Sequence, residues 1–230
     1  MKKIQDPTKK ISIIICARNE EHTIQSVIKR VRNYATEVLV IDGMSKDRTA
    51  VIARRAHAKV IPIARVGKGN AVRKGMRFAR FPIIVFIDAD GSHDPNDIPK
   101  LLATIYSHQA DMVIASRIQG GSDEWSGTFE NSLRKFGTII ITACINLRFN
   151  TRMTDSQNGF RAIRKEIALS LGLNGQTTTI EQEMVIKGLK KGIVITEIAS
   201  HEFARKFGSS HIHVLRNGLG YLWSLGSLLT

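Results

Sequence analysis

Short runs of consecutive apolar residues recur along the first half of the chain. They lie at residues 11–16, 38–41, 83–87 and 112–115, and a shorter run lies at 59–62. Strands covered on both faces read as continuous apolar runs, whereas strands with one wet face alternate. The pattern therefore predicts buried strands at these five places.

Segments with helical spacing separate the predicted strands. The first carries apolar residues three and four apart: Ile24, Val27, Ile28 and Val31. Asp47 can cap a second helix that runs to about His57. A third follows the loop 67–70, and a fourth follows Pro95. Alternating strands and helices predict an α/β fold, a Rossmann-like and mostly parallel central sheet with helices on both faces.

The second half of the chain is less regular. Residues 118–129 predict a mobile loop and 130–147 a long helix. A strand near 159–164, a helix near 180–190 and a strand near 193–198 follow. We divide the chain into a polar leader at 1–10, one folded domain at 11–211 and an apolar C-terminal helix at 212–230.

Composition narrows the class of protein. Lys and Arg number 34 against 20 acids, a formal charge of +14 that favours phosphates, nucleic acid or an anionic membrane as partners. Cys16 and Cys144 form no CxxC pair, so free thiols in a reducing compartment are expected. The basic N-terminus holds no apolar stretch of a signal peptide, and no run is long enough to span a membrane.

Asp88 and Asp90 directly follow a predicted buried strand. Residues two apart in an extended segment point to the same side, and two adjacent carboxylates suit Mg²⁺ or Mn²⁺. The spacing alone leaves a turn of helix-capping acids equally open. Lys68 stands between two glycines, where the backbone can approach a phosphate closely, although a solvated loop lysine fits the same pattern. The chain has neither a P-loop nor a GxGxxG after its first strand.

Seven segments together resemble those of family 2 glycosyltransferases, which have the GT-A fold. They are IIICARNE at 13–20, VIDGMSKDRT at 40–49, GKGNA at 67–71, FIDADGSHDP at 86–95, ASR at 115–117, DSQNGFR at 155–161 and RKFGSS at 205–210. The last three are similar to the branch of dolichol-phosphate mannosyltransferase and its polyprenyl-phosphate relatives. The resemblance spans roughly residues 11 to 211, and the joint order of the segments is its most specific feature.

The resemblance implies a role for each matching position. Asp88 and Asp90 would hold the metal, and Asp90, Arg117 and Asp155 would be the catalytic set. The donor-binding residues would be Ala17, Asn19, Glu20, Asp42, Lys68, Asp88, Arg205 and Ser210. The residues at the acceptor phosphate would be Arg117, Ser132, Arg134 and Arg161.

Three positions depart from the family pattern. Ser92 stands where an amide ligand to the metal is common, which leaves open whether its hydroxyl or a water completes the metal shell. His211 replaces a common lysine of the late motif, which would make phosphate binding there more dependent on pH. Gly43 replaces the second acid at the end of the second strand, which leaves base selection open.

The resemblance implies transfer of mannose or glucose from GDP-mannose or UDP-glucose to a polyprenyl phosphate, with inversion at the anomeric carbon. The acceptor is already anionic, so alignment and stabilisation of the leaving diphosphate would be the main tasks. A family 2 enzyme with a soluble or polysaccharide acceptor is the alternative, and it would need Asp155 or Glu181 as a base. A nucleic-acid-binding protein and a catalytically silent nucleotide-sugar binder are weaker readings, because the basic residues are dispersed and the acids are intact.

The apolar tail at residues 212–230 also fits a lipid substrate. Its Trp and Tyr residues favour a membrane interface, although a helix packed on the core fits the pattern equally well. We expect peripheral attachment at the cytoplasmic face of the membrane and no nucleic-acid partner. The oligomeric state stays open.

Overall fold

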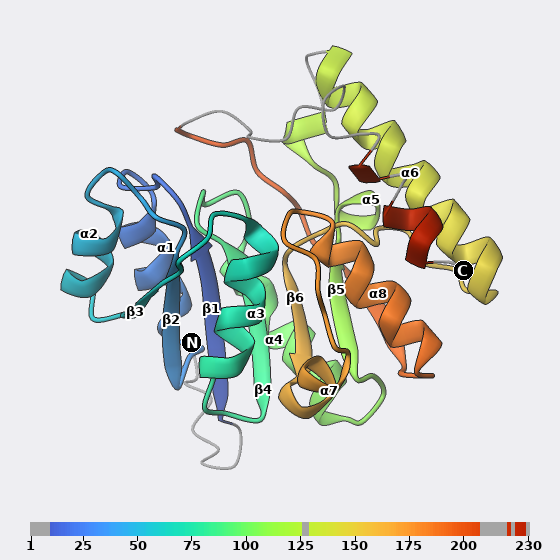
Figure 1. Cartoon of the computed structure of the whole chain (residues 1–230), viewed down its shortest axis with the longest axis horizontal. Helices are drawn as coiled ribbons and strands as arrows, with labels where there is room; N and C mark the ends of the chain where they lie inside the picture. The colour runs from blue at the N-terminus through green and yellow to red at the C-terminus, as the bar shows by residue number, and fades with distance from the viewer. Residues whose placement is uncertain (1–9, 126–128, 208–219, 222–223, 229–230) are drawn as a thin grey trace.

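A seven-stranded sheet organises the molecule in the computed structural model, which describes residues 10–125, 129–207, 220–221 and 224–228 (Figure 1). The strand order is β3-β2-β1-β4-β6-β5-β7. The strands are β1 (Ile11–Ala17), β2 (Glu37–Asp42), β3 (Lys59–Pro62), β4 (Ile83–Asp88), β5 (Met112–Ser116), β6 (Arg161–Arg164) and β7 (Ile195–Ala199). Strand β6 runs antiparallel to β4 and β5, and the other pairs are parallel. The predicted mostly parallel sheet is confirmed.

Strand β1 explains why the apolar runs are continuous. Ile13 and Ile15 belong to the hydrophobic cluster on one face of the sheet, and Ile14 belongs to the cluster on the other face. All three are fully buried. Full burial of a side chain of this size contributes about 1.5–3 kcal/mol to the free energy of folding. Apolar side chains from other elements must therefore cover both faces of the strand.

Helices supply that cover on both faces. The cluster that holds Ile13 is closed by α1 (Ile24–Val31), α2 (Thr49–Arg55) and α4 (Ile98–Tyr106). The cluster that holds Ile14 is closed by α3 (Lys68–Phe78), α6 (Phe129–Phe149), α7 (Lys165–Ser170) and α8 (Ile180–Lys190). The helices on both faces of the sheet are thus as predicted.

Several local expectations differ from the structure. Helix α3 already begins at Lys68, because the 67–70 segment docks as a helical turn against residues 175–176. The segment 118–129 is not an irregular loop where it is described. It holds most of α5 (Arg117–Gly120) and all of η2 (Asp123–Trp125). The Glu202 N–H donates to the Gly121 carbonyl, and the Asp123 N–H donates to the Glu202 carbonyl. The short helix α7 was not predicted, and a further turn, η1 (Pro95–Asp97), precedes α4.

The described part of the C-terminal tail packs on the core. Residues 220–221 and 224–228 are helical, and Leu225 is 5% exposed within the cluster under α8. The Tyr221 hydroxyl donates to Thr178 Oγ1, and Gln182 Nε2 donates to the Tyr221 carbonyl. Residues 1–9 of the predicted leader and the 212–219 stretch lie outside the described residues. No described helix has the length and apolar character of a membrane span.

Candidate functional site

A cavity of about 360 Å³ opens at the carboxyl ends of β1 and β4. Ligands of open α/β sheets bind at this edge. Eight of the predicted site residues line the cavity: Ala17, Glu20, Lys68, Asp88, Asp90, Arg117, Arg134 and Arg205. The structure therefore gathers residues from both halves of the chain into one polar cavity.

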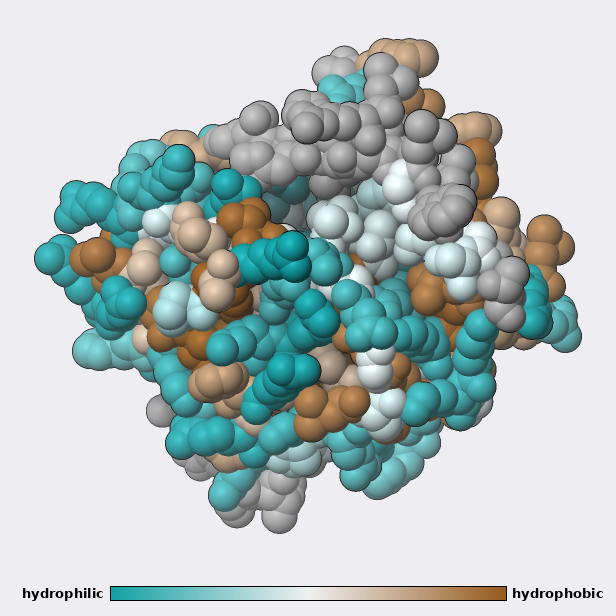
Figure 2. Space-filling view, viewed as in Figure 1, coloured by the Kyte–Doolittle hydropathy of each residue, from teal (hydrophilic) through white to brown (hydrophobic). Residues whose placement is uncertain are grey.

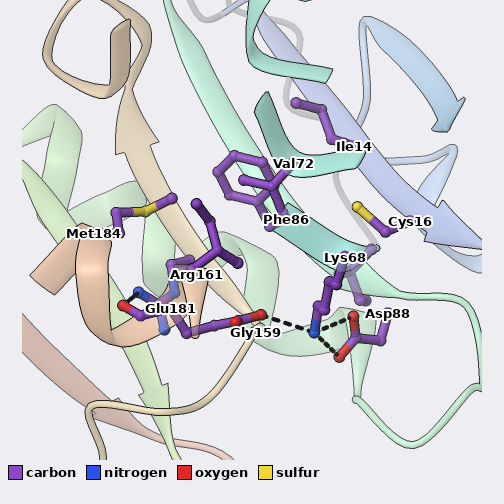
Figure 3. A pocket seen from close by; sticks show the side chains of 12 residues that line it. Ile14, Cys16, Lys68, Val72, Phe86, Asp88, Gly159, Arg161, Glu181 and Met184 are labelled. Carbon is purple, nitrogen blue, oxygen red and sulfur yellow. Dashed lines mark hydrogen bonds and ion pairs between the residues drawn. The ribbon is translucent and has the colours of Figure 1, made fainter. Parts of the chain in front are cut away.

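Asp88 and Asp90 project into this cavity, as their spacing predicted. The Lys68 ammonium lies 2.8 Å from Asp88 Oδ1 and 3.0 Å from Asp88 Oδ2 (Figure 3). Burial would raise the pKa of the Asp88 carboxyl, but Lys68 and the nearby His93 hold it well below its ordinary value. His93 is buried, with its Nε2 3.5 Å from Asp88 Oδ2. Asp88 is thus an ionised carboxylate with an orienting partner behind it.

Asp90 is held from two sides. Its Oδ1 accepts hydrogen bonds from the backbone N–H and the hydroxyl of Ser92, at 3.0 and 2.7 Å. Its Oδ2 lies 3.1 Å from Arg205 Nη2. Ser92 is buried and its hydroxyl donates to Asp90, so Ser92 orients the carboxylate.

The two aspartates fit a divalent cation. The described residues contain no group of three His, Cys, Asp or Glu side chains that could hold a metal by themselves. Mg²⁺ commonly needs fewer, because it binds one or two carboxylates together with substrate phosphates and waters. Asp88 and Asp90 supply two hard oxygen ligands on the cavity wall, and His93 and Ser92 supply the outer contacts that orient such ligands.

Arg117 follows β5 and is locked to the segment that enters β6. Its Nε and Nη2 lie 2.7 and 3.0 Å from the two Asp155 oxygens, and its backbone N–H donates to the same carboxylate. Its guanidinium also lies 3.6 Å from Glu202 and 4.9 Å from the Trp125 ring centroid. Burial would raise the pKa of Asp155, but the Arg117 charge and hydrogen bonds lower it below its ordinary value.

Arg134 and Arg205 converge on one carboxylate, Glu124 of η2. Arg134 Nη1 lies 3.8 Å and Arg205 Nε 3.9 Å from Glu124 Oε2, while the Arg205 backbone N–H donates to Oε1 at 2.8 Å. Burial and the neighbouring Arg205 lower the pKa of Arg134. Glu124 therefore holds both arginines at this part of the cavity, and Arg205 also reaches Asp90.

Arg161 occupies a different place from the one that its motif implies. It is 1% exposed and is absent from the residues that line the cavity. Its guanidinium donates to the backbone carbonyls of Ser156, Asn158 and Glu181. Buried carbonyls need donors, so Arg161 holds the 155–161 segment in shape, and the acceptor-phosphate role carried over from the motif has no contact with the cavity to support it.

Of the residues predicted to bind the nucleoside, only some line the cavity. Asp42 is buried with Oδ1 unpartnered among the described residues, and Oδ2 accepts from the Ser45 N–H at 3.4 Å. Its neighbour Gly43 lines the cavity. Asn19 turns with a φ of 56° and caps the Lys46 N–H at 2.8 Å. Burial raises the pKa of Glu20.

Two further predictions fall elsewhere. Ser132 lies exposed on α6, outside the set that lines the cavity. Ser210 and His211 lie outside the described residues. Conversely, Glu202 and Arg18 line the cavity, and Glu124 holds its arginines, without having been singled out. Glu202 stands three residues before Arg205, which is the signal that could have found it.

Comparison with known proteins places this geometry in a family. The profile described as glycosyl transferase family 2 matches residues 12–172. The chain is 30% identical over 211 residues to the glycosyltransferase AglJ of Haloferax volcanii, covering 90% of this chain and 68% of the relative. It is 32% identical over 194 residues to the dolichol-phosphate mannosyltransferase of Pyrococcus furiosus, covering 80% of this chain and 54% of the relative. An uncharacterized glycosyltransferase of Mycobacterium tuberculosis is 28% identical over 202 residues, covering 88% of this chain and 89% of the relative.

A solved structure shares the fold. Glucosyl-3-phosphoglycerate synthase from Mycobacterium tuberculosis, crystallised with Mn²⁺, UDP and glucosyl-3-phosphoglycerate, superposes with a TM-score of 0.76 at 21% identity, over 96% of this chain and 80% of that one. This likeness and the sheet order identify the fold as GT-A. The chain therefore belongs to glycosyl transferase family 2 and is a glycosyltransferase.

Proposed function

We propose that the protein transfers a hexose from a nucleoside-diphosphate sugar to a polyprenyl phosphate, with inversion and with Mg²⁺ or Mn²⁺ bound at Asp88 and Asp90. GDP-mannose and UDP-glucose are the donors to test first. The two aspartates would hold the cation, which neutralises charge on the donor diphosphate as it leaves. Lys68 and Arg205 stand beside these carboxylates and can bind the same phosphates.

One observation carries the acceptor assignment: Asp155 and Glu181, the two carboxylates that the sequence offered as a base, are already engaged. Asp155 is fully buried and bound through both oxygens to Arg117. Glu181 is buried, lies 2.9 Å from the Lys68 ammonium and is absent from the cavity wall. A hydroxyl acceptor needs a base within reach, whereas a phosphate oxygen is already anionic. The site therefore suits a phosphate nucleophile.

The arginines fit the same acceptor. Arg117 and Arg134 line the cavity, and their ion pairs are with Asp155, Glu202 and Glu124 rather than with Asp88 and Asp90. The planar guanidinium can bind two phosphate oxygens at once. Fixed arginines would align the acceptor oxygen with the anomeric carbon, which is the largest task left when no proton has to be removed.

A lipid acceptor also explains the exposed face of α6. This helix presents five large apolar side chains to solvent: Phe129, Phe136, Ile139, Ile140 and Leu147. Phe129 and Leu147 are 84% and 86% exposed, and the exposed cations Lys135 and Arg148 flank the stripe. Brown and tan residues follow the edge of the molecule where α6 runs (Figures 1 and 2). An apolar face with flanking cations is typical of a helix that lies in the interface of an anionic membrane.

We propose that α6, rather than the tail, makes the peripheral membrane contact. Arg134 of the same helix lines the cavity, so a membrane under α6 would bring lipid phosphates to the site. The free thiols of Cys16 and Cys144 suit the reducing, cytoplasmic side of that membrane.

An acceptor panel tests the proposal. Purified protein, Mn²⁺ and each donor are incubated with a short polyprenyl phosphate, the matching polyprenol and 3-phosphoglycerate as a soluble phosphorylated alcohol. Transfer to the polyprenyl phosphate alone is the expected result. Equal use of the polyprenol would refute the anionic nucleophile, and transfer to phosphoglycerate alone would establish the soluble-acceptor alternative.

A further inference from the structure

Lys68 lies between two carboxylates that come from different elements. Its ammonium is 2.8 Å from Asp88 Oδ1 and 2.9 Å from Glu181 Oε1. Asp88 lines the main cavity, whereas Glu181 faces a small void behind Lys68 (Figure 3). Glu181 therefore acts on the cavity through Lys68.

Glu181 depends on this contact for its charge balance. The side chain is buried, and its Oε2 has no hydrogen-bond partner among the described residues. The Lys68 ammonium forms an ion pair with this carboxylate, while the nearby Arg161 guanidinium donates to the Glu181 backbone carbonyl. A buried carboxylate without a partner is strongly destabilising, so the pair fixes both side chains.

The backbone around the start of α8 fixes the position of Glu181. It lies in the first turn of α8, and the preceding turn docks on the start of α3, where the Gly69 N–H donates to the Gln176 carbonyl at 3.1 Å. A Cβ on Gly67 would lie 2.2 Å from Gln176 O, and one on Gly69 would lie 2.3 Å from Gly175 O. The two helix starts touch so closely that only glycine fits, and the Lys68–Glu181 distance follows from that contact.

Asp88 cannot serve Lys68 and a divalent cation equally. If Asp88 ligated a divalent cation, its carboxylate would lie next to both that cation and the Lys68 ammonium. The two positive charges would then repel each other. Glu181 lies on the side away from the cavity and keeps an anionic partner for Lys68 in that situation. An ammonium held in this way remains aimed at the phosphates.

We propose that Glu181 is a positioning residue that holds Lys68 for the donor diphosphate. The inference rests on the proposed donor and is independent of the acceptor. It also gives Glu181 a role other than that of the base which a soluble acceptor would need.

Titration calorimetry of Glu181→Gln tests this role. GDP and UDP are titrated with Mn²⁺ present, and guanosine and uridine are the matching ligands without phosphate. Loss of a charged hydrogen-bond partner should weaken binding of the diphosphate roughly tenfold and leave nucleoside binding unchanged. Glu181→Asp keeps the charge and should lose part of that affinity, again for the diphosphate alone.

A double-variant cycle with Lys68→Met shows whether Glu181 acts through Lys68. The double variant should bind the diphosphate no more weakly than Lys68→Met alone. Glu37→Gln is the matched control, since Glu37 is also buried but bonds Ser12 and Arg80 at the start of β2; it should alter stability and spare both affinities.

Equal losses for diphosphate and nucleoside, or additive losses in the cycle, would overturn the inference. Unaltered protein that binds neither GDP nor UDP would instead overturn the proposed donor.

Discussion

The two halves of the cavity are built differently. In the first half, Asp88 ends the buried strand β4, and Asp90 follows in the turn that leaves this strand. In the second half, Arg117, Arg134 and Arg205 come from a short helix, a long helix and an irregular segment. Acids from other segments hold them: Asp155, Glu124 and Glu202. The end of a strand places the aspartates, which also pair with Lys68 and Arg205, whereas the arginines depend on acids from other segments.

This difference predicts how each half responds to substitution. A carboxylate at or just after the end of a strand can be replaced with little effect on the fold, because the ladder keeps the preceding backbone fixed. An arginine held by a buried acid cannot be replaced without leaving that acid unpaired. Functional loss and loss of stability should therefore separate in the first half and coincide in the second.

The largest effect is expected from Asp90→Ala. Removal of one of two metal carboxylates should lower turnover roughly thousandfold, while the melting temperature changes little. Initial rates with Mn²⁺, with and without a chelator, measure this loss. Asp94→Asn is the control, because Asp94 lies four residues on and pairs with Arg30 outside the cavity; turnover that survives both Asp90→Ala and the chelator would contradict the metal role.

Arg117→Lys should have the next largest effect. Lysine keeps the charge but loses the two-pronged bond to Asp155, which leaves that buried acid poorly paired. We expect about a hundredfold loss in kcat/KM for polyprenyl phosphate together with a lower Tm. Arg30→Lys, at a surface ion pair, should change neither. Full activity at an unchanged Tm would show that the second half does not depend on this pair.

A smaller effect should follow from removing the α6 stripe. Replacing Phe129, Phe136 and Leu147 by Ser removes exposed apolar surface, so the core and the transfer to a detergent-solubilised acceptor should be unaffected. Sedimentation with anionic vesicles should fall at least about tenfold. Leu169→Ser, which alters an exposed leucine of α7, serves as the comparison. Unchanged vesicle binding would move the membrane contact away from α6.

The smallest effect concerns the segment that carries Arg205. His201 Nδ1 lies 3.0 Å from the Gly120 carbonyl oxygen and Nε2 lies 3.0 Å from Asp123 Oδ1. The Gly120 carbonyl, followed by Asp123, raises the pKa of His201 above its ordinary 6.5. A raised pKa in the folded state means that the stabilisation is present below that value and is lost as the pH rises through the folded pKa.

Hydrogen exchange of residues 200–205 should therefore speed up by a few fold between pH 6 and pH 8 beyond the intrinsic rate. His201→Asn should remove this extra pH dependence. An identical profile in the variant would show that another group controls the segment.

Sequence reasoning worked where the sheet alone decides position. The spacing of Asp88 and Asp90 predicts a shared side on the assumption of an extended segment, and both line the cavity, although Asp90 lies in the turn after β4. It failed for Arg161, because the motif does not reveal that β6 is antiparallel and that buried carbonyls of Ser156 and Asn158 must find donors there. It also missed Glu124, whose function depends on two arginines that are distant in sequence.

The reversed strand β6 has a consequence for the residue that can stand at position 159. Because β6 runs against β4, its entry segment reaches the same edge of the sheet as the end of β4 without a crossover. Gly159 of that segment sits so close that a Cβ would lie 2.7 Å from Lys68 Nζ and 3.0 Å from Asp88 Oδ2. Any side chain at position 159 would therefore displace the Lys68 ammonium or the Asp88 carboxylate, which restricts this position to glycine while that ion pair is kept.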